Sequence, residues 1–214
     1  MSGAMQFARD NDEQLTPAEE EQARANVYGL LARLWYAAPD QQLLETFSRS
    51  GRAADATDDV GDTRLAQTWR ALARACAEAT VENVTHEYDS LFIGTGSAEI
   101  TLYCSYYLTE TGRERVLVAL RDELRTLGLA RTHATSEPED HFAALLEVMR
   151  HLIVQRTYDA QITLQKEFFL RYIRSAYVPL AEAVLANGGA HFYKDVAHLT
   201  RAFLDVESES FNMI

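Results

Sequence analysis

Hydrophobic residues recur at spacings of three and four along most of the chain, which is the pattern of helices that bury one face. The first such run follows Thr16 and Pro17, which suit an N-cap and a first helical position, and Glu19 completes a capping box. Its apolar face is formed by Val27, Leu30, Leu31 and Leu34. We therefore predict a long helix that begins at about residue 17 and ends near residue 38.

The same periodicity predicts further helices over residues 41–49, 63–79, 81–93, 113–127, 137–153, 161–186 and 192–205. Residues 50–62 are small and polar, which predicts a loop. Residues 94–112 combine glycines, β-branched residues and aromatics, which predicts a long extended connection. No segment of the sequence alternates as a strand ladder would. The predicted fold class is all-α, a single-domain bundle of roughly seven to nine helices.

The length and composition agree with one ordered domain. A chain of 214 residues can bury one good-sized core, and 47% of its residues are hydrophobic while glycine and proline are sparse. We expect a flexible N-terminus over residues 1–14, a single all-helical domain over residues 15–207 and a C-terminal tail over residues 208–214.

The cysteines and the hydropathy pattern indicate where the protein works. Two cysteines, Cys76 and Cys104, are too few for a disulfide scaffold or a four-cysteine zinc site. The first residues lack a secretory signal, and no apolar run is long enough to span a bilayer. We therefore expect a cytoplasmic protein without stable membrane insertion.

The formal net charge of −12 narrows the class of partner. Binding to nucleic acid requires clustered lysine and arginine, so a nucleic-acid partner is disfavoured. An acidic surface can instead attract a basic peptide by long-range electrostatics.

The densest chemistry lies in the sequence SEPEDH. Ser136 and Glu139 have the spacing of a capping box, and Pro138 would occupy the first turn of the helix that follows. Capping does not explain His141, which would lie at the edge of the apolar stripe of that helix. His141 could be a partly buried structural residue or could face a ligand.

An enzymatic alternative must be considered for the same region. Carboxylates and histidines at helical spacings would allow a metal-dependent helical-bundle enzyme that uses Asp140, Glu147, His151, Asp195 and His198. The first three of these would lie on the polar side of one helix, and the Glu-x-x-His motif of carboxylate-bridged bundles does not occur in the sequence. Cys104 and Ser105 are not in a nucleophile motif, and GTGSAE lacks the third glycine and the lysine of phosphate-binding loops.

Aromatic residues are concentrated on both sides of the long connection. Tyr88, Leu91 and Phe92 end one predicted helix, and Tyr103, Tyr106, Tyr107 and Leu108 follow soon after. Tyrosine combines an apolar ring with a polar tip, so this concentration is typical of a surface that binds a peptide or protein, although core packing is the competing interpretation.

Three blocks in this order resemble the TorD/DmsD family of cytoplasmic chaperones for molybdenum redox enzymes, to which the NarJ-type chaperones are related. The blocks are EYDSLFIGTGSAEITLYCSYYL, LGLARTHATSEPEDHFAALLEVMRHLI, and QKEFFLRYIRSAYVPLAEAVL with FYKDVAHLTRAFL after it. The Glu-Pro-x-Asp-His signature of the family corresponds to Glu137, Pro138, Asp140 and His141. The resemblance covers roughly residues 80–207. Tyr103 differs from many relatives, which carry tryptophan there.

The resemblance implies an all-helical protein that is not an enzyme and needs no cofactor. Its partners would be the twin-arginine signal peptide and the apo catalytic subunit of an exported molybdenum oxidoreductase, held until cofactor insertion is complete. The protein would be a monomer or a domain-swapped dimer. The implied peptide-binding residues are Tyr88, Leu91, Phe92, Tyr103, Ser105, Glu137, Pro138, Asp140 and His141.

The resemblance also implies that these residues form a peptide-binding groove and have different roles in it. Aromatic and apolar residues would receive the hydrophobic stretch of the leader, and Asp140 with nearby carboxylates would receive its arginines. An interaction module with an unrelated client remains a further hypothesis. Guanine nucleotides have been connected with the family, but the sequence contains no phosphate-cradling motif to support that.

Overall fold

The computed structural model describes residues 17–56, 63–94, 98–129, 138–155 and 158–213. These residues form helices and no strand, which confirms the all-α prediction. Two short π-helical segments interrupt the α-helices. Because η1 continues α4, and η2 joins α8 to α9 without a break, the described part of the chain contains nine continuous helices, within the predicted range.

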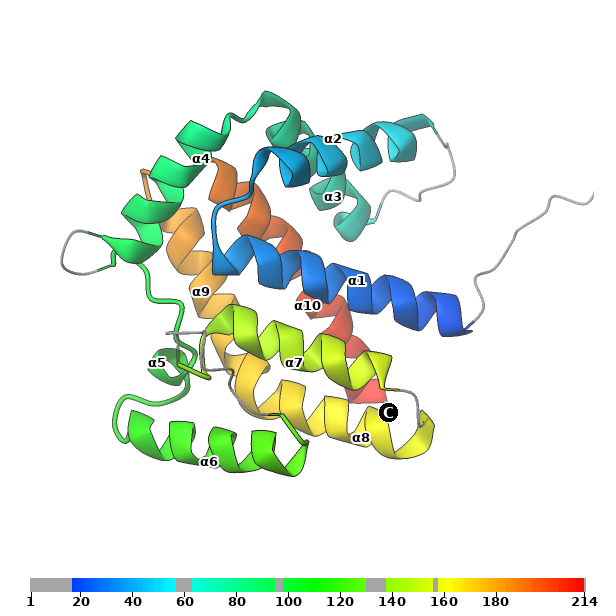
Figure 1. The fold of residues 1–214 in the computed structure, drawn as a ribbon, viewed down its shortest axis with the longest axis vertical. Helices are drawn as coiled ribbons and strands as arrows, with labels where there is room; N and C mark the ends of the chain where they lie inside the picture. The colour runs from blue at the N-terminus through cyan, green and yellow to red at the C-terminus, as the bar shows by residue number, and fades with distance from the viewer. Residues whose placement is uncertain (1–16, 57–62, 95–97, 130–137, 156–157, 214) are drawn as a thin grey trace, which may run out of the picture.

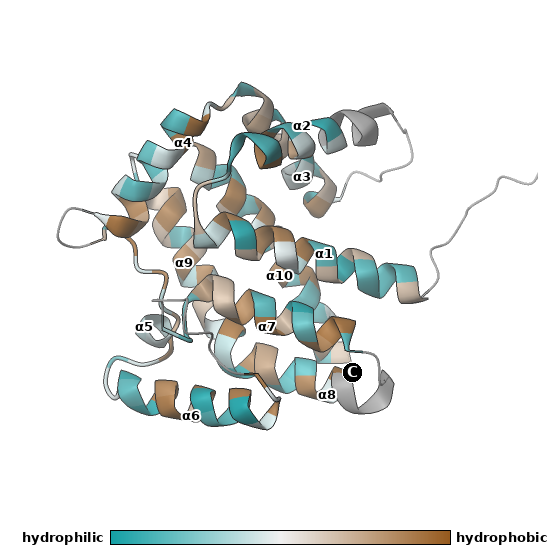
Figure 2. Ribbon diagram, viewed as in Figure 1, coloured by the Kyte–Doolittle hydropathy of each residue, from teal (hydrophilic) through white to brown (hydrophobic). Residues whose placement is uncertain are grey.

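The elements follow one another along the chain as α1 (Pro17–Tyr36), α2 (Gln41–Ala56), α3 (Arg64–Glu78), α4 (Val81–Tyr88), η1 (Asp89–Ile93), α5 (Ser105–Leu108), α6 (Arg113–Thr126), α7 (Phe142–Val154), α8 (Tyr158–Phe168), η2 (Phe169–Ile173), α9 (Arg174–Ala186) and α10 (Phe192–Met213). In Figure 1, α1 and α7 lie side by side, with α9 and α10 behind them. The pair α2 and α3 packs on one side of this centre, and α5 and α6 lie on the opposite side. Figure 2 shows that α7 and α9 carry many hydrophobic residues, whereas α6 and the first half of α1 are mostly hydrophilic.

Two predicted helix ends are confirmed by their caps. The Thr80 hydroxyl accepts a hydrogen bond from the Asn83 amide at the start of α4. At the end of α6, Gly128 adopts a φ of 72°, and the amide of Leu129 donates to the Leu124 carbonyl at 2.8 Å. This is the Schellman arrangement, in which a left-handed residue after the helix satisfies its last carbonyls.

Several predicted boundaries were wrong. Residues 105–108, which we expected in an extended connection, form the short helix α5. Residues 50–56, which we expected in a loop, continue α2. Residues 208–213, which we expected in a C-terminal tail, continue α10, and Phe211 is buried. The Phe211 ring packs on that of Phe169 with centroids 5.2 Å apart, and the guanidinium of Arg24 lies 5.4 Å from its centroid. These contacts hold the last turns of α10 in helical form. The predicted flexible N-terminus, residues 1–14, lies outside the described residues.

The core is centred on Trp35 near the end of α1. Its ring packs edge-on against Phe92 of η1 and Phe142 of α7, with centroids 5.7 and 5.6 Å away. Its indole N–H donates to the Thr200 hydroxyl of α10 at 2.9 Å, so the polar tip of this fully buried side chain is satisfied. Trp35 therefore joins three elements that are distant in sequence.

A buried ion pair joins the first half of α1 to α10. Arg24 donates to both carboxylate oxygens of Glu207 at 2.8 Å, and the Tyr28 hydroxyl donates to the same carboxylate at 2.8 Å. A further guanidinium N–H donates to Gln165 of α8 at 2.9 Å. The Glu207 side chain is 5% exposed, so its charge depends on these partners.

We predict that Arg24→Met lowers the free energy of unfolding by about 3 kcal/mol, because the buried Glu207 carboxylate loses the cation that it is paired with. Urea unfolding followed by circular dichroism measures the change. Arg33→Met is the matched control on the same helix, since the Arg33–Asp40 pair is exposed and its loss should destabilise the fold much less. Equal losses for the two variants would contradict the prediction.

Candidate functional site

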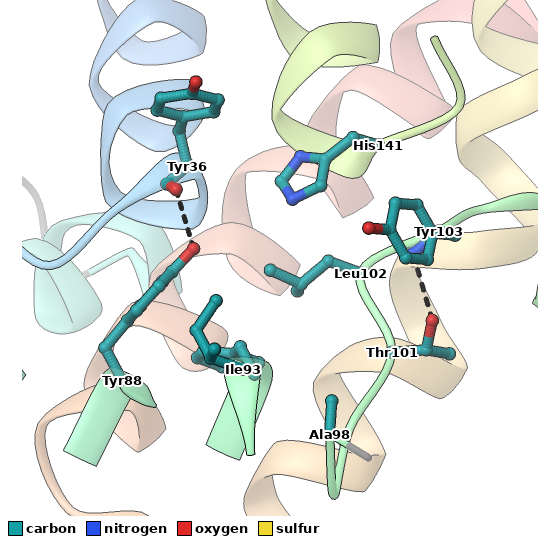
Figure 3. Close-up of a pocket in the computed structure, with 9 residues that line it drawn as sticks. Tyr36, Tyr88, Ile93, Ala98, Thr101, Leu102, Tyr103 and His141 are labelled. Atoms are coloured by element: carbon teal, nitrogen blue, oxygen red, sulfur yellow. Dashed lines mark hydrogen bonds between the residues drawn. The ribbon is translucent and has the colours of Figure 1, made fainter. Parts of the chain in front are cut away.

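A pocket with a volume of about 220 Å³ opens where the end of α1, the end of η1 and the connection before α5 meet. It is lined by Tyr36, Tyr88, Phe92, Ile93, Ala98, Thr101, Leu102, Tyr103 and His141. Figure 3 shows these side chains arranged around one space, with Tyr36 and Tyr88 on one side and Tyr103 on the other. The pocket therefore brings together residues of two sequence blocks. One block contains the concentrated aromatic residues, and the other contains the Asp-His signature.

The η1 segment shapes one wall. A π-helix has a wider turn than an α-helix and often marks a functional position. Here it buries Leu91 and Phe92 and leaves Ile93 59% exposed at the pocket. The segment ends at Gly94, whose φ of 65° favours glycine and whose amide donates to the Asp89 carbonyl at 2.7 Å.

Tyr88 holds the end of α1 against this wall. Its hydroxyl donates to the Tyr36 carbonyl at 2.7 Å (Figure 3). The same hydroxyl lies 3.3 Å from the Trp35 carbonyl. The carbonyls of a last helical turn lack partners within the helix, and Tyr88 supplies one from another element. Tyr36, which is 48% exposed, is thereby presented at the mouth of the pocket.

The opposite wall is held by a short antiparallel bridge between Tyr103 and His141. The Cys104 amide donates to the Asp140 carbonyl at 2.9 Å, and the Phe142 amide donates to the Leu102 carbonyl at 2.8 Å. The extended connection and the residues before α7 therefore run side by side. This pairing sets the relative position of the Tyr103 and His141 side chains.

His141 lies between two tyrosine rings and caps α7. Its ring packs edge-on against Tyr36 and Tyr103, with centroids 6.1 and 5.8 Å away. Its Nδ1 accepts a hydrogen bond from the Ala143 amide at 3.3 Å, so His141 is the N-cap of α7. His141 is therefore a structural residue, as the first of the two interpretations held, and it also lines the pocket. That it faces a ligand stays a prediction.

The predicted start of this helix was wrong. We expected Ser136 to cap it and Pro138 to occupy its first turn, but α7 begins at Phe142. The amide of Phe142 is bonded to Leu102, so the preceding residues follow the bridge instead of the helix. Pro138 is half-buried, and its carbonyl accepts from the His141 amide at 3.2 Å. Ser136 and Glu137 lie outside the described residues.

The expectation that Asp140 lies on a polar helix face was also wrong. Asp140 precedes α7 and is 2% exposed. Its Oδ2 accepts a hydrogen bond from the amide of Ser105, the first residue of α5, at 3.2 Å. Ser105 is buried too. Both residues lie behind the pocket wall and are not among the residues that line it.

Of the predicted site residues, the pocket brings together Tyr88, Phe92, Tyr103 and His141. Leu91 belongs to the core beneath it. Sequence reasoning missed the lining residues Tyr36, Ile93, Ala98, Thr101 and Leu102. Tyr36 left a signal in the sequence, since it follows Trp35 at the end of an amphipathic run, but nothing local places it beside residues more than fifty positions away.

The described residues do not favour the enzymatic alternatives. No group of three or more His, Cys, Asp or Glu side chains among them could hold a metal ion. The residues proposed for a metal site therefore do not come together in the described part of the chain. Cys104 is buried, and burial together with the negative charge of Asp140 raises the pKa of its thiol well above its usual range. A thiol that keeps its proton is a poor nucleophile. Among the described helices, none is long and apolar enough to cross a membrane.

Comparison with known proteins places the chain in a family. The model of the nitrate reductase delta subunit family matches residues 58–181, more than half of the chain. The chain belongs to this family. It is also 26% identical over 209 residues to the chaperone protein TorD of Shewanella loihica, a match that covers 91% of this chain and 95% of that protein. The resemblance inferred from the three sequence blocks is thereby confirmed.

A solved structure agrees in fold. The crystal structure of a proposed redox enzyme maturation protein from Archaeoglobus fulgidus is similar, with a TM-score of 0.52 and 21% sequence identity. The similarity covers 92% of this chain and 99% of that one. At this identity the likeness shows a shared helical fold.

We predict that His141→Ala lowers the free energy of unfolding by about 1 to 2 kcal/mol, since it removes both the cap of α7 and a buried ring. His141→Asn should recover part of this loss because asparagine can accept the Ala143 amide. Urea unfolding compares the variants. His151→Ala, in the last turn of the same helix, is the control, and its effect should stay below about 0.5 kcal/mol. An Asn variant no more stable than the Ala variant would disprove the capping role.

Proposed function

We propose that this protein is a cytoplasmic, non-enzymatic maturation chaperone that binds the twin-arginine signal peptide of an exported molybdenum oxidoreductase. The aromatic pocket receives part of that peptide, and the apo catalytic subunit is held until its cofactor is inserted. Support comes from the family membership, from the similarity to a TorD chaperone, and above all from the pocket.

The composition of the pocket favours an apolar side chain. None of the described residues that line it is Asp, Glu, Lys or Arg, and most are aromatic or aliphatic. One of its hydroxyl groups is already bonded within the protein, since the Tyr88 hydroxyl donates to the Tyr36 carbonyl at the end of α1. Exposed rings at Tyr36 and Tyr103 and the exposed Ile93 form an apolar rim that a hydrophobic leader segment would cover.

The charge of the protein favours a basic peptide. The chain carries a formal net charge of −12, and exposed carboxylates at Asp89 and Glu99 directly follow the lining residues Tyr88 and Ala98. Such charges accelerate encounter with a cationic leader, and their effect weakens as salt screens them. The arginines of the leader would therefore lie outside the apolar pocket, near these carboxylates.

Titration of the protein with twin-arginine leader peptides from its own genome tests the proposal. We predict that Tyr103→Ala weakens binding by about tenfold or more, as for a ring that anchors an interface. Isothermal titration calorimetry measures the affinity, and thermal unfolding verifies that the variant is folded.

Tyr106→Ala is the matched control for this titration. Tyr106 is more exposed than Tyr103, at 51% against 37%, but it does not line the pocket. Its loss should change the affinity by about twofold or less. If no leader and no apo-molybdoenzyme binds the wild-type protein, the proposed function is wrong. Equal effects of the two tyrosine variants would place the peptide elsewhere on the molecule.

A further inference from the structure

Asp140 makes two bonds at the start of α5, to the turn that Cys104 and Ser105 form. Its carboxylate Oδ2 accepts from the Ser105 amide at 3.2 Å, and its main-chain oxygen accepts from the Cys104 amide at 2.9 Å. Side chain and backbone thus hold two successive amides. With an exposed fraction of 2%, the carboxylate is withdrawn from solvent, and a hydrogen bond to a buried charged group is worth more than a neutral one.

These bonds lie directly beside the pair that forms one wall of the pocket. Cys104 and Ser105 follow Tyr103, and Asp140 precedes His141. The contacts that Asp140 makes therefore lie next to the antiparallel bridge between Tyr103 and His141. A shift of the turn away from Asp140 would move the Tyr103 ring relative to His141, although Asp140 itself does not line the pocket.

The charge of Asp140 acts on groups of its own chain. It contributes to raising the pKa of the Cys104 thiol, after burial. It also helps to raise the pKa of Arg121 on α6, after the larger effect of Glu139, whose carboxylate lies 3.0 Å from that guanidinium. An arginine of a bound peptide would have to reach a carboxylate that is covered and already bonded.

We propose that Asp140 is a positioning residue of the leader-binding pocket, which holds Tyr103 and His141 in register, and that it does not bind the arginines of the leader. The proposal rests on the proposed function and reverses the role that the family signature suggests for this aspartate. A positioning role depends on an oxygen that accepts the Ser105 amide. An arginine-binding role depends on the negative charge.

The two roles are separated by Asp140→Asn and Asp140→Ala. Asparagine keeps the size and one acceptor oxygen but removes the charge, whereas alanine removes both. We expect Asp140→Asn to bind the leader within about twofold of the wild type, and Asp140→Ala to bind about tenfold more weakly. Asp122→Asn, which removes an exposed charge on α6 outside the pocket lining, is the control and should bind within about twofold of the wild type.

Hydrogen exchange of the Ser105 amide provides a readout that needs no peptide. We expect the amide to stay protected in the wild type and in Asp140→Asn, and to exchange faster in Asp140→Ala. Failure of the wild type to bind leaders would refute the proposed function, while the exchange data would still show whether Asp140 holds the turn.

Two results would overturn the positioning role. One is an Asp140→Asn variant with a protected Ser105 amide that binds as weakly as Asp140→Ala, since the charge would then be what matters. The other is an Asp140→Ala variant with wild-type affinity. If Asp140→Ala does not fold, Asp140→Asn decides alone: near wild-type affinity supports the proposal, and lost affinity with a protected amide overturns it.

Discussion

The burial of Trp35 is the interaction on which the pocket depends. Its ring contacts Phe92 and Phe142, and each of these is part of the pocket lining or adjacent in sequence to a lining residue. Tyr36 follows Trp35, and His141 precedes Phe142. A single side chain thus sets the distances among three walls that come from α1, η1 and the start of α7. Because protein interiors are close-packed, a displacement of this ring would be transmitted to all three.

Two sets of hydrogen bonds then fix the positions of the walls that Trp35 brings together. Tyr88 holds the last carbonyls of α1, and the bridge between residues 102–104 and 140–142 holds the connection against α7. Both satisfy backbone groups that a helix end or an extended segment would otherwise leave without partners inside the protein. The walls of the pocket are therefore held by bonds within the protein, so a ligand of this pocket would require little further ordering of these walls.

The apolar groups of the pocket and the charged groups near it occupy different positions. The lining is aromatic and aliphatic, the aspartate of the family signature is buried behind it, and exposed carboxylates follow lining residues in the sequence. A leader with a basic segment beside a hydrophobic one has the complementary pattern. Under the proposed function, specificity among leaders would depend on rim side chains such as Tyr36, Ile93 and Tyr103, and the overall acidity would govern the rate of encounter.

Local sequence determined the helices, because apolar spacing and caps such as Thr80 and Gly128 act within a few residues. Through the aromatic concentration and the family signature it also predicted that Tyr88, Phe92, Tyr103 and His141 belong to one site, and these four residues do line one pocket. The tertiary structure alone decided that α7 begins at Phe142, since the bond from Phe142 to Leu102 joins segments forty residues apart. It likewise placed Tyr36 in the pocket and buried Asp140, because partners distant in the chain fix both positions and no local pattern contains them.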